Sequence, residues 1–387
     1  MCVAVIIESN NKGSKYNMKK LGFGCMRLPK LSEAAKDIDH AQVCQMVDTF
    51  IDNGFTYFDT AYMYHEGTSE MAVREDLVKR YDRDKFVLAD KLPTMRLNEA
   101  ADMQRIFDEQ RQKCGVEYFD YYLLHNLNTR FYDTAVKLGA FDFIKSKKEQ
   151  GGAKNIGFSF HAGADLLDEI LTKYPIFDFV QLQINYLDWE HTGIQSRKCY
   201  EVARRHGLPI IVMEPVKGGT LANVPARAES IMKQYAPEAS VASWAIRYAA
   251  GLEGVMMVLS GMSNYDQLCD NIGYMKDFKP LSDAEQEIIG RVRNILYEST
   301  IIPCTGCAYC TEGCPANIAI NELFSMYNEG LKSETKDIST QKAAYDEHTK
   351  SSAKASDCIG CGQCETQCPQ SLPVIDLLRA VAREFEK

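Results

Sequence analysis

Eight of the fourteen cysteines in this 387-residue chain lie near its C-terminus, in two copies of one spacing. The first copy consists of Cys304, Cys307, Cys310 and Cys314 followed by Pro315, and the second of Cys358, Cys361, Cys364 and Cys368 followed by Pro369. Two residues between thiolates allow one tight loop to present three sulfurs to a single metal cluster, while the fourth, set apart by three residues and a proline, points elsewhere. The C-terminal segment is therefore expected to fold around bound metal.

This repeated spacing resembles that of two-cluster bacterial ferredoxins, in which the fourth cysteine of each motif ligates the cluster of the other motif. The resemblance implies two 4Fe-4S clusters, one held by Cys304, Cys307, Cys310 and Cys368, the other by Cys358, Cys361, Cys364 and Cys314. Zinc is the main alternative, since C-x2-C pairs also form tetrahedral zinc sites, but a zinc ribbon needs only two such pairs.

Composition and charge restrict where such a chain works. Six further cysteines are scattered along a sequence without a secretory leader, which indicates a reducing compartment rather than disulfides. We therefore expect a cytoplasmic protein, and exposed clusters favour an anaerobic or low-oxygen cell. A net charge of −9 argues against nucleic acid or an anionic membrane as a partner. The apolar stretch from Val3 to Ile7 is too short for a membrane span.

Most of the chain precedes the cysteine motifs and must form a core of its own. Short apolar runs recur there, each followed by a segment with helical apolar spacing, which is typical of parallel strands buried on both faces. The runs are Leu21 to Leu28, Phe55 to Thr60, Lys85 to Lys91, Phe119 to His125, Ala153 to Ser159, Phe177 to Asn185, Pro209 to Glu214 and Gly254 to Gly261. Eight such units predict an α/β (β/α)8 TIM barrel. An open doubly wound sheet is disfavoured, because no G-x-G-x-x-G follows an early strand.

The expected domain organisation follows from these two parts. Residues 1–17 form a possible extension, 18–280 the barrel, 281–300 a connecting helix and 301–387 the two-cluster domain. The pattern Ser282-Asp283-Ala284-Glu285 is a capping box that predicts the start of the connecting helix. The 43 residues between the cysteine motifs are long and helical in character, so we expect a small α-helical ferredoxin-like domain packed on the barrel.

Titratable side chains follow three of the predicted strands. Asp59 ends the second run, with Tyr64 in the loop beyond it, Lys91 ends the third and His125 ends the fourth. Barrel enzymes carry their chemistry at these carboxyl ends. An Asp keeps a partly buried Lys charged, and we expect that ammonium to lower the pKa of the phenol, which can then exchange a proton with a carbonyl or alcohol. A surface charge or a satisfied core group is the ordinary explanation for any one of these residues, but not for all four.

From Met18 to Asn271 the sequence resembles the aldo-keto reductase family. Phe58-Asp59-Thr60-Ala61 with Tyr64, Lys91 and Leu123-Leu124-His125 match its catalytic Asp, Tyr, Lys and His. The resemblance implies that Tyr64 is the general acid/base, Lys91 modulates its pKa, Asp59 pairs with Lys91 and His125 orients the carbonyl. The branch of the family with a C-terminal cysteine domain matches the whole chain.

The same resemblance implies a set of cofactor-binding residues. Ser159 and Gln181 correspond to side chains that hold the nicotinamide carboxamide, Met213 to Gly219 to a loop along the pyrophosphate, and Gly261 to Asn271 to an adenosine segment. The residues expected to contact NAD(H) or NADP(H) are Ser159, Gln181, Met213, Lys217, Gly218, Gly261, Gln267, Asp270 and Asn271. Phe160 and Met213 depart from the usual pattern. Gln267 and Gly261 stand where NADP-preferring members have basic residues, so NADH is favoured unless Lys217 or another basic residue takes over.

Three functions remain open at this point. The leading one is an oxidoreductase that reduces a carbonyl or oxidises an alcohol and carries two 4Fe-4S clusters. Nicotinamide moves two electrons as hydride whereas each cluster moves one. The second function is therefore an electron-transfer enzyme in which a flavin, bound in this barrel or on a partner, links the clusters to NAD(P)H or to substrate, with a ferredoxin or flavoprotein as a possible redox partner. The third makes the barrel a non-catalytic binding or regulatory module. The sequence does not name the substrate.

Overall fold

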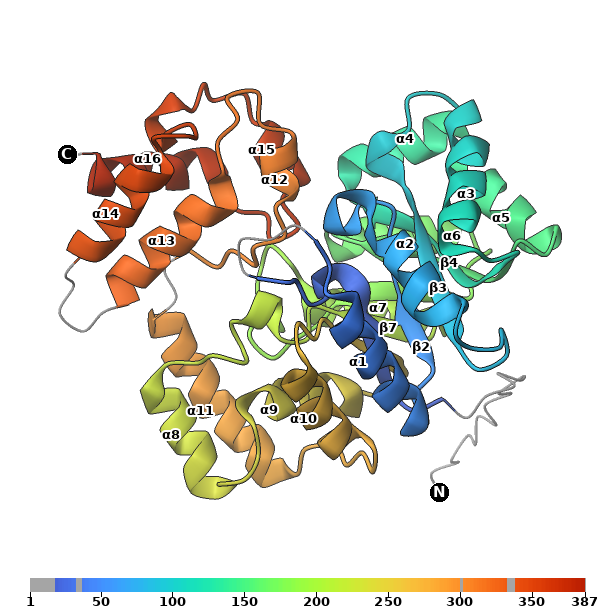
Figure 1. Cartoon of the computed structure of the whole chain (residues 1–387), viewed down its shortest axis with the longest axis horizontal. Coiled ribbons are helices and arrows are strands. Elements are labelled where there is room, and N and C mark those ends of the chain that lie inside the picture. Colours follow the sequence, from blue (N-terminus) through green and yellow to red (C-terminus); the bar gives the residue numbers. More distant parts are fainter. Residues whose placement is uncertain (1–17, 33–36, 300–301, 333–337, 387) are drawn as a thin grey trace, which may run out of the picture.

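The computed structural model describes residues 18–32, 37–299, 302–332 and 338–386. The expectation that residues 1–17 are an extension lies outside these ranges. Within them the chain forms two bodies, a barrel from blue to yellow and a helical cysteine domain in orange and red (Figure 1). None of the described helices combines the length and the apolar composition that crossing a bilayer requires.

The barrel has the predicted eight strands, all parallel, closed by pairing of β1 with β8. They are β1 (Leu21–Gly24), β2 (Tyr57–Asp59), β3 (Val87–Pro93), β4 (Phe119–Leu127), β5 (Ala153–Phe160), β6 (Phe179–Gln183), β7 (Ile210–Met213) and β8 (Val255–Ser260). Their residues are almost all buried, because helices cover the outside of the barrel and side chains fill its inside. The prediction of a (β/α)8 TIM barrel is confirmed. The first strand is shorter than the predicted apolar run from Leu21 to Leu28, because a 3-10 turn follows Gly24.

Helices surround this barrel and continue beyond it (Figure 1). Those of the barrel body are α1 (His40–Asp52), α2 (Ser69–Val73), α3 (Ala101–Cys114), α4 (Thr129–Leu138), α5 (Ala140–Glu149), α6 (Ala164–Lys173), α7 (Ser196–Arg205), α8 (Ala226–Tyr235), α9 (Val241–Gly251) and α10 (Tyr265–Met275). Local chemistry fixes several of their ends. The Asn128 side chain accepts a hydrogen bond from the backbone N–H of Phe131 at the start of α4, and Gly139 ends that helix with φ at 76°.

Helix α11 (Asp283–Ser299) leads from the barrel to the cysteine domain and begins at the predicted capping box. The Ser282 backbone N–H donates to the Glu285 carboxylate at 2.8 Å, and the Glu285 N–H donates to the Ser282 hydroxyl at 3.3 Å. The helix packs along α8 (Figure 1) and shares with it a second apolar core that contains Trp244. The capping pattern therefore located this element correctly.

The cysteine domain is helical, as the sequence predicts. It contains α12 (Tyr309–Glu312), α13 (Ile320–Lys332), α14 (Ser339–His348), α15 (Gln363–Gln367) and α16 (Val374–Phe385). Phe324, Tyr345, Leu378 and Phe385 are buried together with several of the cysteines in a separate core. The segment between the two motifs thus supplies the helices that enclose the cysteine loops.

Close contacts join this domain to the barrel. Gly218, after β7, has φ at 64°, and a Cβ placed on it would lie 2.4 Å from the carbonyl oxygen of Thr305. A guanidinium nitrogen of Arg27 donates to the same carbonyl at 3.0 Å. The side-chain amides of Gln183 and Gln370 exchange two hydrogen bonds, at 3.0 and 3.1 Å, and both are buried. The cysteine domain is therefore held over the carboxyl end of the barrel.

Candidate functional site

The four side chains expected to be catalytic meet at the carboxyl end of the barrel. The Lys91 ammonium, on β3, lies 2.6 Å from an oxygen of Asp59, at the end of β2, and 3.4 Å from the Tyr64 hydroxyl. It also donates to the carbonyl of Thr60 at 2.7 Å. The ring of His125, on β4, meets that of Tyr64 edge to face, with centroids 6.1 Å apart. These side chains converge because β2, β3 and β4 are neighbouring parallel strands, so their carboxyl ends lie side by side at one end of the barrel.

Burial sets the protonation of these groups. It raises the pKa of Tyr64 well above its ordinary value, and the charges of Asp59 and Glu214 raise it further. Burial also lowers the pKa of His125 well below its ordinary value, helped by the positive charge of Lys91. Tyr64 is thus a neutral phenol and His125 a neutral imidazole at physiological pH. The pKa of Tyr64 is thus displaced upward and not downward as expected from Lys91, because desolvation is the largest contribution.

The four side chains border a cavity of about 510 Å³. That volume lies within the usual range for a small-molecule site. Of the residues expected to bind a nicotinamide cofactor, those that line the cavity are Ser159, Gln181, Met213, Gly218, Gly261, Gln267, Asp270 and Asn271. Gln181 is buried and its side-chain oxygen has no partner among the described residues, which leaves an acceptor for a ligand. The structure therefore brings the two expected sets together around one space.

Lys217 is the exception. Its ammonium is buried 2.7 and 2.8 Å from the two carboxylate oxygens of Asp188 and donates to Gln370 at 2.8 Å. It is not part of the cavity wall. The structure therefore places Lys217 apart from the other residues expected to bind the cofactor, because its ammonium is paired with Asp188 and bonded to the cysteine domain through Gln370.

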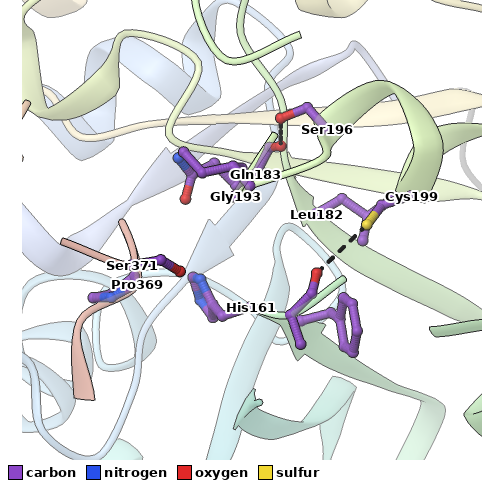
Figure 2. Close-up of a pocket in the computed structure, with 11 residues that line it drawn as sticks. His161, Leu182, Gln183, Gly193, Ser196, Cys199, Pro369 and Ser371 are labelled. Carbon is purple, nitrogen blue, oxygen red and sulfur yellow. Dashed lines mark hydrogen bonds between the residues drawn. The ribbon is translucent and has the colours of Figure 1, made fainter. Parts of the chain in front are cut away.

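Further residues line the same cavity that the sequence analysis did not name as contacts of the cofactor. From the barrel these are Arg27, His161 and Glu214, and from the cysteine domain Cys307, Tyr309 and Pro369. The Nδ1 of His161 is buried and has no partner among the described residues, and burial lowers the pKa of His161 to about 4. Figure 2 shows its ring beside Pro369 and Ser371, in a smaller pocket that adjoins the main cavity. Its position directly after the Ser159 motif was the one available signal.

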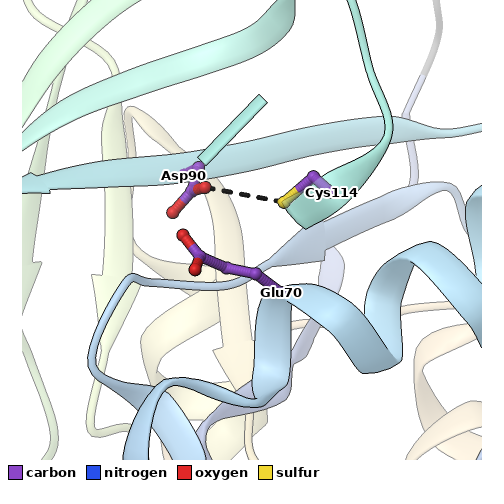
Figure 3. A group of neighbouring side chains, drawn as sticks. All are labelled: Glu70, Asp90 and Cys114. Carbon is purple, nitrogen blue, oxygen red and sulfur yellow. Dashed lines mark hydrogen bonds between the residues drawn. The ribbon is translucent and has the colours of Figure 1, made fainter. Parts of the chain in front are cut away.

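Three buried groups lie behind Lys91 without reaching the cavity. Glu70, Asp90 and Cys114 point toward one another (Figure 3), and the Cys114 thiol is 3.7 Å from Asp90. Burial, and then the Glu70 charge, raise the pKa of Asp90 well above its ordinary value. The Lys113 ammonium, 3.3 Å from Glu70, balances the remaining charge. These contacts favour a protonated Asp90 carboxyl within the cluster.

The eight motif cysteines form two groups in space. Cys304, Cys307, Cys310 and Cys368 line one small void, and Cys314, Cys358, Cys361 and Cys364 line another. Each void thus takes three sulfurs from one motif and the fourth from the other motif. Burial raises the pKa of several of these thiols, to about 12 for Cys307 and Cys310, so a free thiolate is disfavoured unless a cation is bound beside it. Sets of four sulfurs suit iron-sulfur clusters.

Comparison with known proteins identifies both parts. The aldo/keto reductase family model matches residues 20–294, and the 4Fe-4S dicluster domain model matches residues 303–372. The chain belongs to the aldo-keto reductase family. It is an oxidoreductase whose C-terminal helical region is a 4Fe-4S domain.

Individual relatives are distant. The chain is 21% identical over 290 residues to the uncharacterized oxidoreductase YqkF of Bacillus subtilis, which covers 67% of this chain and 88% of the relative. Aldo-keto reductase AKR11C1 from Bacillus halodurans superposes with a TM-score of 0.58 at 20% identity, covering 70% of this chain and 91% of that one. An aldo/keto reductase from Klebsiella pneumoniae, solved with NADP and acetate, gives 0.58 at 19% identity over 71% and 92%. These likenesses concern the barrel fold.

Proposed function

We propose that this protein is a cytoplasmic oxidoreductase that reduces a carbonyl or oxidises an alcohol with NAD(H) or NADP(H), and that it carries two 4Fe-4S clusters. The observation that carries the first half is the Lys91 ammonium between Asp59 and Tyr64 on the wall of a ligand-sized cavity. Two solved relatives from Klebsiella pneumoniae hold NADP or NADPH, which supports a nicotinamide cofactor here. Gln181, with its free acceptor, suits the carboxamide of that cofactor.

The chain's own residues supply the proton chemistry. The cofactor contributes hydride when it is bound. Tyr64, a neutral phenol, donates its proton to the carbonyl oxygen, and Lys91 stabilises the phenolate that remains. The neutral His125 orients the oxygen by a hydrogen bond, and Asp59 keeps the Lys91 ammonium in place through their 2.6 Å contact. The high pKa of Tyr64 keeps the phenol protonated, as a general acid must be before it donates.

The cysteine groups support the second half of the proposal. Cys304, Cys307, Cys310 and Cys368 would hold one 4Fe-4S cluster, and Cys314, Cys358, Cys361 and Cys364 the other. Such clusters transfer single electrons, which a ferredoxin or flavoprotein partner would deliver or accept. The flavin-linked alternative is favoured by one observation, which is that Cys307 lines both a cluster void and the barrel cavity.

The test of the barrel activity is Tyr64→Phe in protein purified anaerobically. The change removes the proton donor and keeps the ring, so NAD(P)H-dependent carbonyl reduction should fall by about 10²–10⁴-fold. Cofactor dissociation constants, measured by fluorescence titration, should stay near the wild-type value. Tyr62→Phe is the matched control, because Tyr62 bonds to Glu109 and does not line the cavity. Wild-type turnover by Tyr64→Phe would contradict the proposed role.

A further inference from the structure

The cysteine domain forms part of the wall of the barrel cavity. Cys307 and Tyr309 precede and begin α12, Pro369 follows Cys368, and all three line the same space as Tyr64 and His125. The rings of His125 and Tyr309 meet edge to face, with centroids 6.4 Å apart. A molecule bound beside Tyr64 therefore touches both domains.

One cysteine belongs to two spaces at once. Cys307 lines the barrel cavity and also the void shared by Cys304, Cys310 and Cys368. The other void, which includes Cys361, has no residue in common with the cavity wall, and Cys361 is exposed. The two cysteine groups therefore differ in position, one facing the cavity and the other facing outward.

From this arrangement we infer that the cavity binds a conjugated dicarbonyl ring, a quinone or a flavin, which takes electrons directly from the inner cluster. The inference rests on the proposed loading of both voids with 4Fe-4S clusters. Each cluster delivers one electron at a time, at the potentials that iron-sulfur clusters reach in proteins. A saturated ketone or aldehyde has no one-electron state at those potentials, whereas a conjugated dicarbonyl ring does. Of these ligands, only a conjugated ring can therefore accept single electrons from the cluster that Cys307 would hold.

The chemistry of the cavity suits such a ring. The edge-to-face series of Tyr64, His125 and Tyr309 offers aromatic walls to a flat ligand. His125 and His161 are neutral and donate hydrogen bonds to carbonyl oxygens without adding charge.

The electron count is self-consistent. Reduction of either ring adds two electrons and two protons: a quinone forms two O–H bonds at its carbonyl oxygens, and a flavin forms two N–H bonds at its ring nitrogens. The two clusters provide one electron each, Tyr64 provides one proton and is reprotonated from solvent, and solvent provides the other. A low-potential one-electron donor protein, acting at the outward-facing cysteine group, restores the clusters.

The first experiment detects contact without turnover. Fully reduced protein is mixed with a naphthohydroquinone, which accepts no electrons, and the cluster signals are recorded by electron paramagnetic resonance. We expect one cluster signal to change and the other to stay the same. Cys361→Ser, which alters a ligand of the outward-facing group alone, assigns the two signals. No change, or a change in the outward cluster only, would overturn the inference. Reduced flavin mononucleotide in a parallel sample shows which of the two rings binds.

The second experiment counts electrons. Photoreduced protein without nicotinamide should be fully oxidised by about one naphthoquinone per chain, since two clusters hold two electrons, while cyclohexanone should leave it reduced. Tyr309→Ala should weaken hydroquinone binding about tenfold by removing one aromatic wall. Tyr235→Ala, on α8 and half exposed, is the matched control and should bind like wild type. Equal oxidation by the saturated ketone, or equal binding by Tyr309→Ala, would refute the inference.

The outcomes also separate this inference from the proposed function. If the anaerobically purified protein contains no iron, both the proposed function with its two clusters and this inference are refuted. Protein that contains iron and reduces simple carbonyls with NAD(P)H, yet shows no hydroquinone effect on its clusters, defeats only the conjugated-ring inference.

Discussion

At the level of single residues, burial decides the chemistry of the cavity. Tyr64 and His125 have pKa values displaced in opposite directions, and both displacements favour the neutral form. Asp59 has one oxygen on Lys91 and one without a partner among the described residues. The site therefore holds a charged pair beside neutral hydrogen-bond donors, an arrangement that suits proton donation to an oxygen.

The pH dependence of carbonyl reduction follows from these directions. Tyr64 loses its proton only above its ordinary pKa, and the histidines gain theirs only below their ordinary pKa, near pH 4 for His161. The rate should be nearly constant from about pH 6 to about pH 9. A profile of kcat/KM against pH checks this expectation. A steep fall between about pH 7 and about pH 8 would show that another group controls the rate.

Cofactor preference is also a residue-scale question. Gln267 and Gly261 line the cavity where a 2′-phosphate would benefit from cations, and the Gln267 side chain accepts a hydrogen bond from the Ser263 N–H instead. Lys217, the other candidate, is paired with Asp188. NADH should therefore bind at least as tightly as NADPH. Titration of both cofactors at equal ionic strength tests this, and a tenfold preference for NADPH would contradict it.

At the level of elements, the turn after β7 and the segment after Cys368 join the two domains. Lys217, Asp188 and Gln370 form a buried polar network between them, and Asp188 also accepts from the Gln183 amide at 2.9 Å. Gly218 permits the close approach of Thr305. These contacts hold Pro369 and the neighbouring Cys368 against the barrel.

Removing the Lys217 ammonium from this network should lower the stability of the protein. Lys217→Met leaves the Asp188 carboxylate buried without its charge partner, so the free energy of unfolding should fall by about 3–5 kcal/mol. Urea denaturation of anaerobic protein measures it. Lys79→Met is the control, because the exposed Lys79–Glu75 pair should contribute little. A loss equal to that of the control would mean that the buried pair does not hold the domains together.

At the level of the whole molecule, the two cysteine motifs are interleaved. Each void takes its fourth sulfur from the other motif, so neither set of four is complete until the two motifs, which are separated by α13 and α14, come together. Binding of metal and folding of this domain are thereby coupled. The barrel has a core of its own.

The interleaving predicts both the iron content and the effect of one substitution. Anaerobically purified protein should contain about eight irons per chain. Cys314→Ala should disturb the cluster whose other ligands are Cys358, Cys361 and Cys364, and leave the remaining cluster signal close to wild type. Iron analysis and electron paramagnetic resonance provide the measurement. Anomalous iron density joining Cys314 to the cluster of Cys304 would refute the crossed ligation, and two zinc ions without iron would refute electron transfer altogether.

Patterns in the sequence predicted the strands, the helix α11 and the residues at the ends of these elements. Apolar runs placed all eight strands, because a parallel strand is buried on both faces and its composition shows this directly. The capping box located α11, and strand ends singled out Asp59, Lys91 and His125, since in a barrel all carboxyl ends meet on one face. The crossed grouping of the cysteines was implied by the resemblance of their spacing to that of two-cluster ferredoxins.

Interactions between residues far apart in the chain could not be predicted in this way. Desolvation of Tyr64 depends on everything packed around it, so the sequence suggested a lowered pKa where burial raises it. Lys217 has no sequence signal for its pairing with Asp188 and Gln370, which lie 29 and 153 positions away. Cys307 and Tyr309 line the barrel cavity because the domains dock, and docking depends on complementary surfaces that no spacing of residues records.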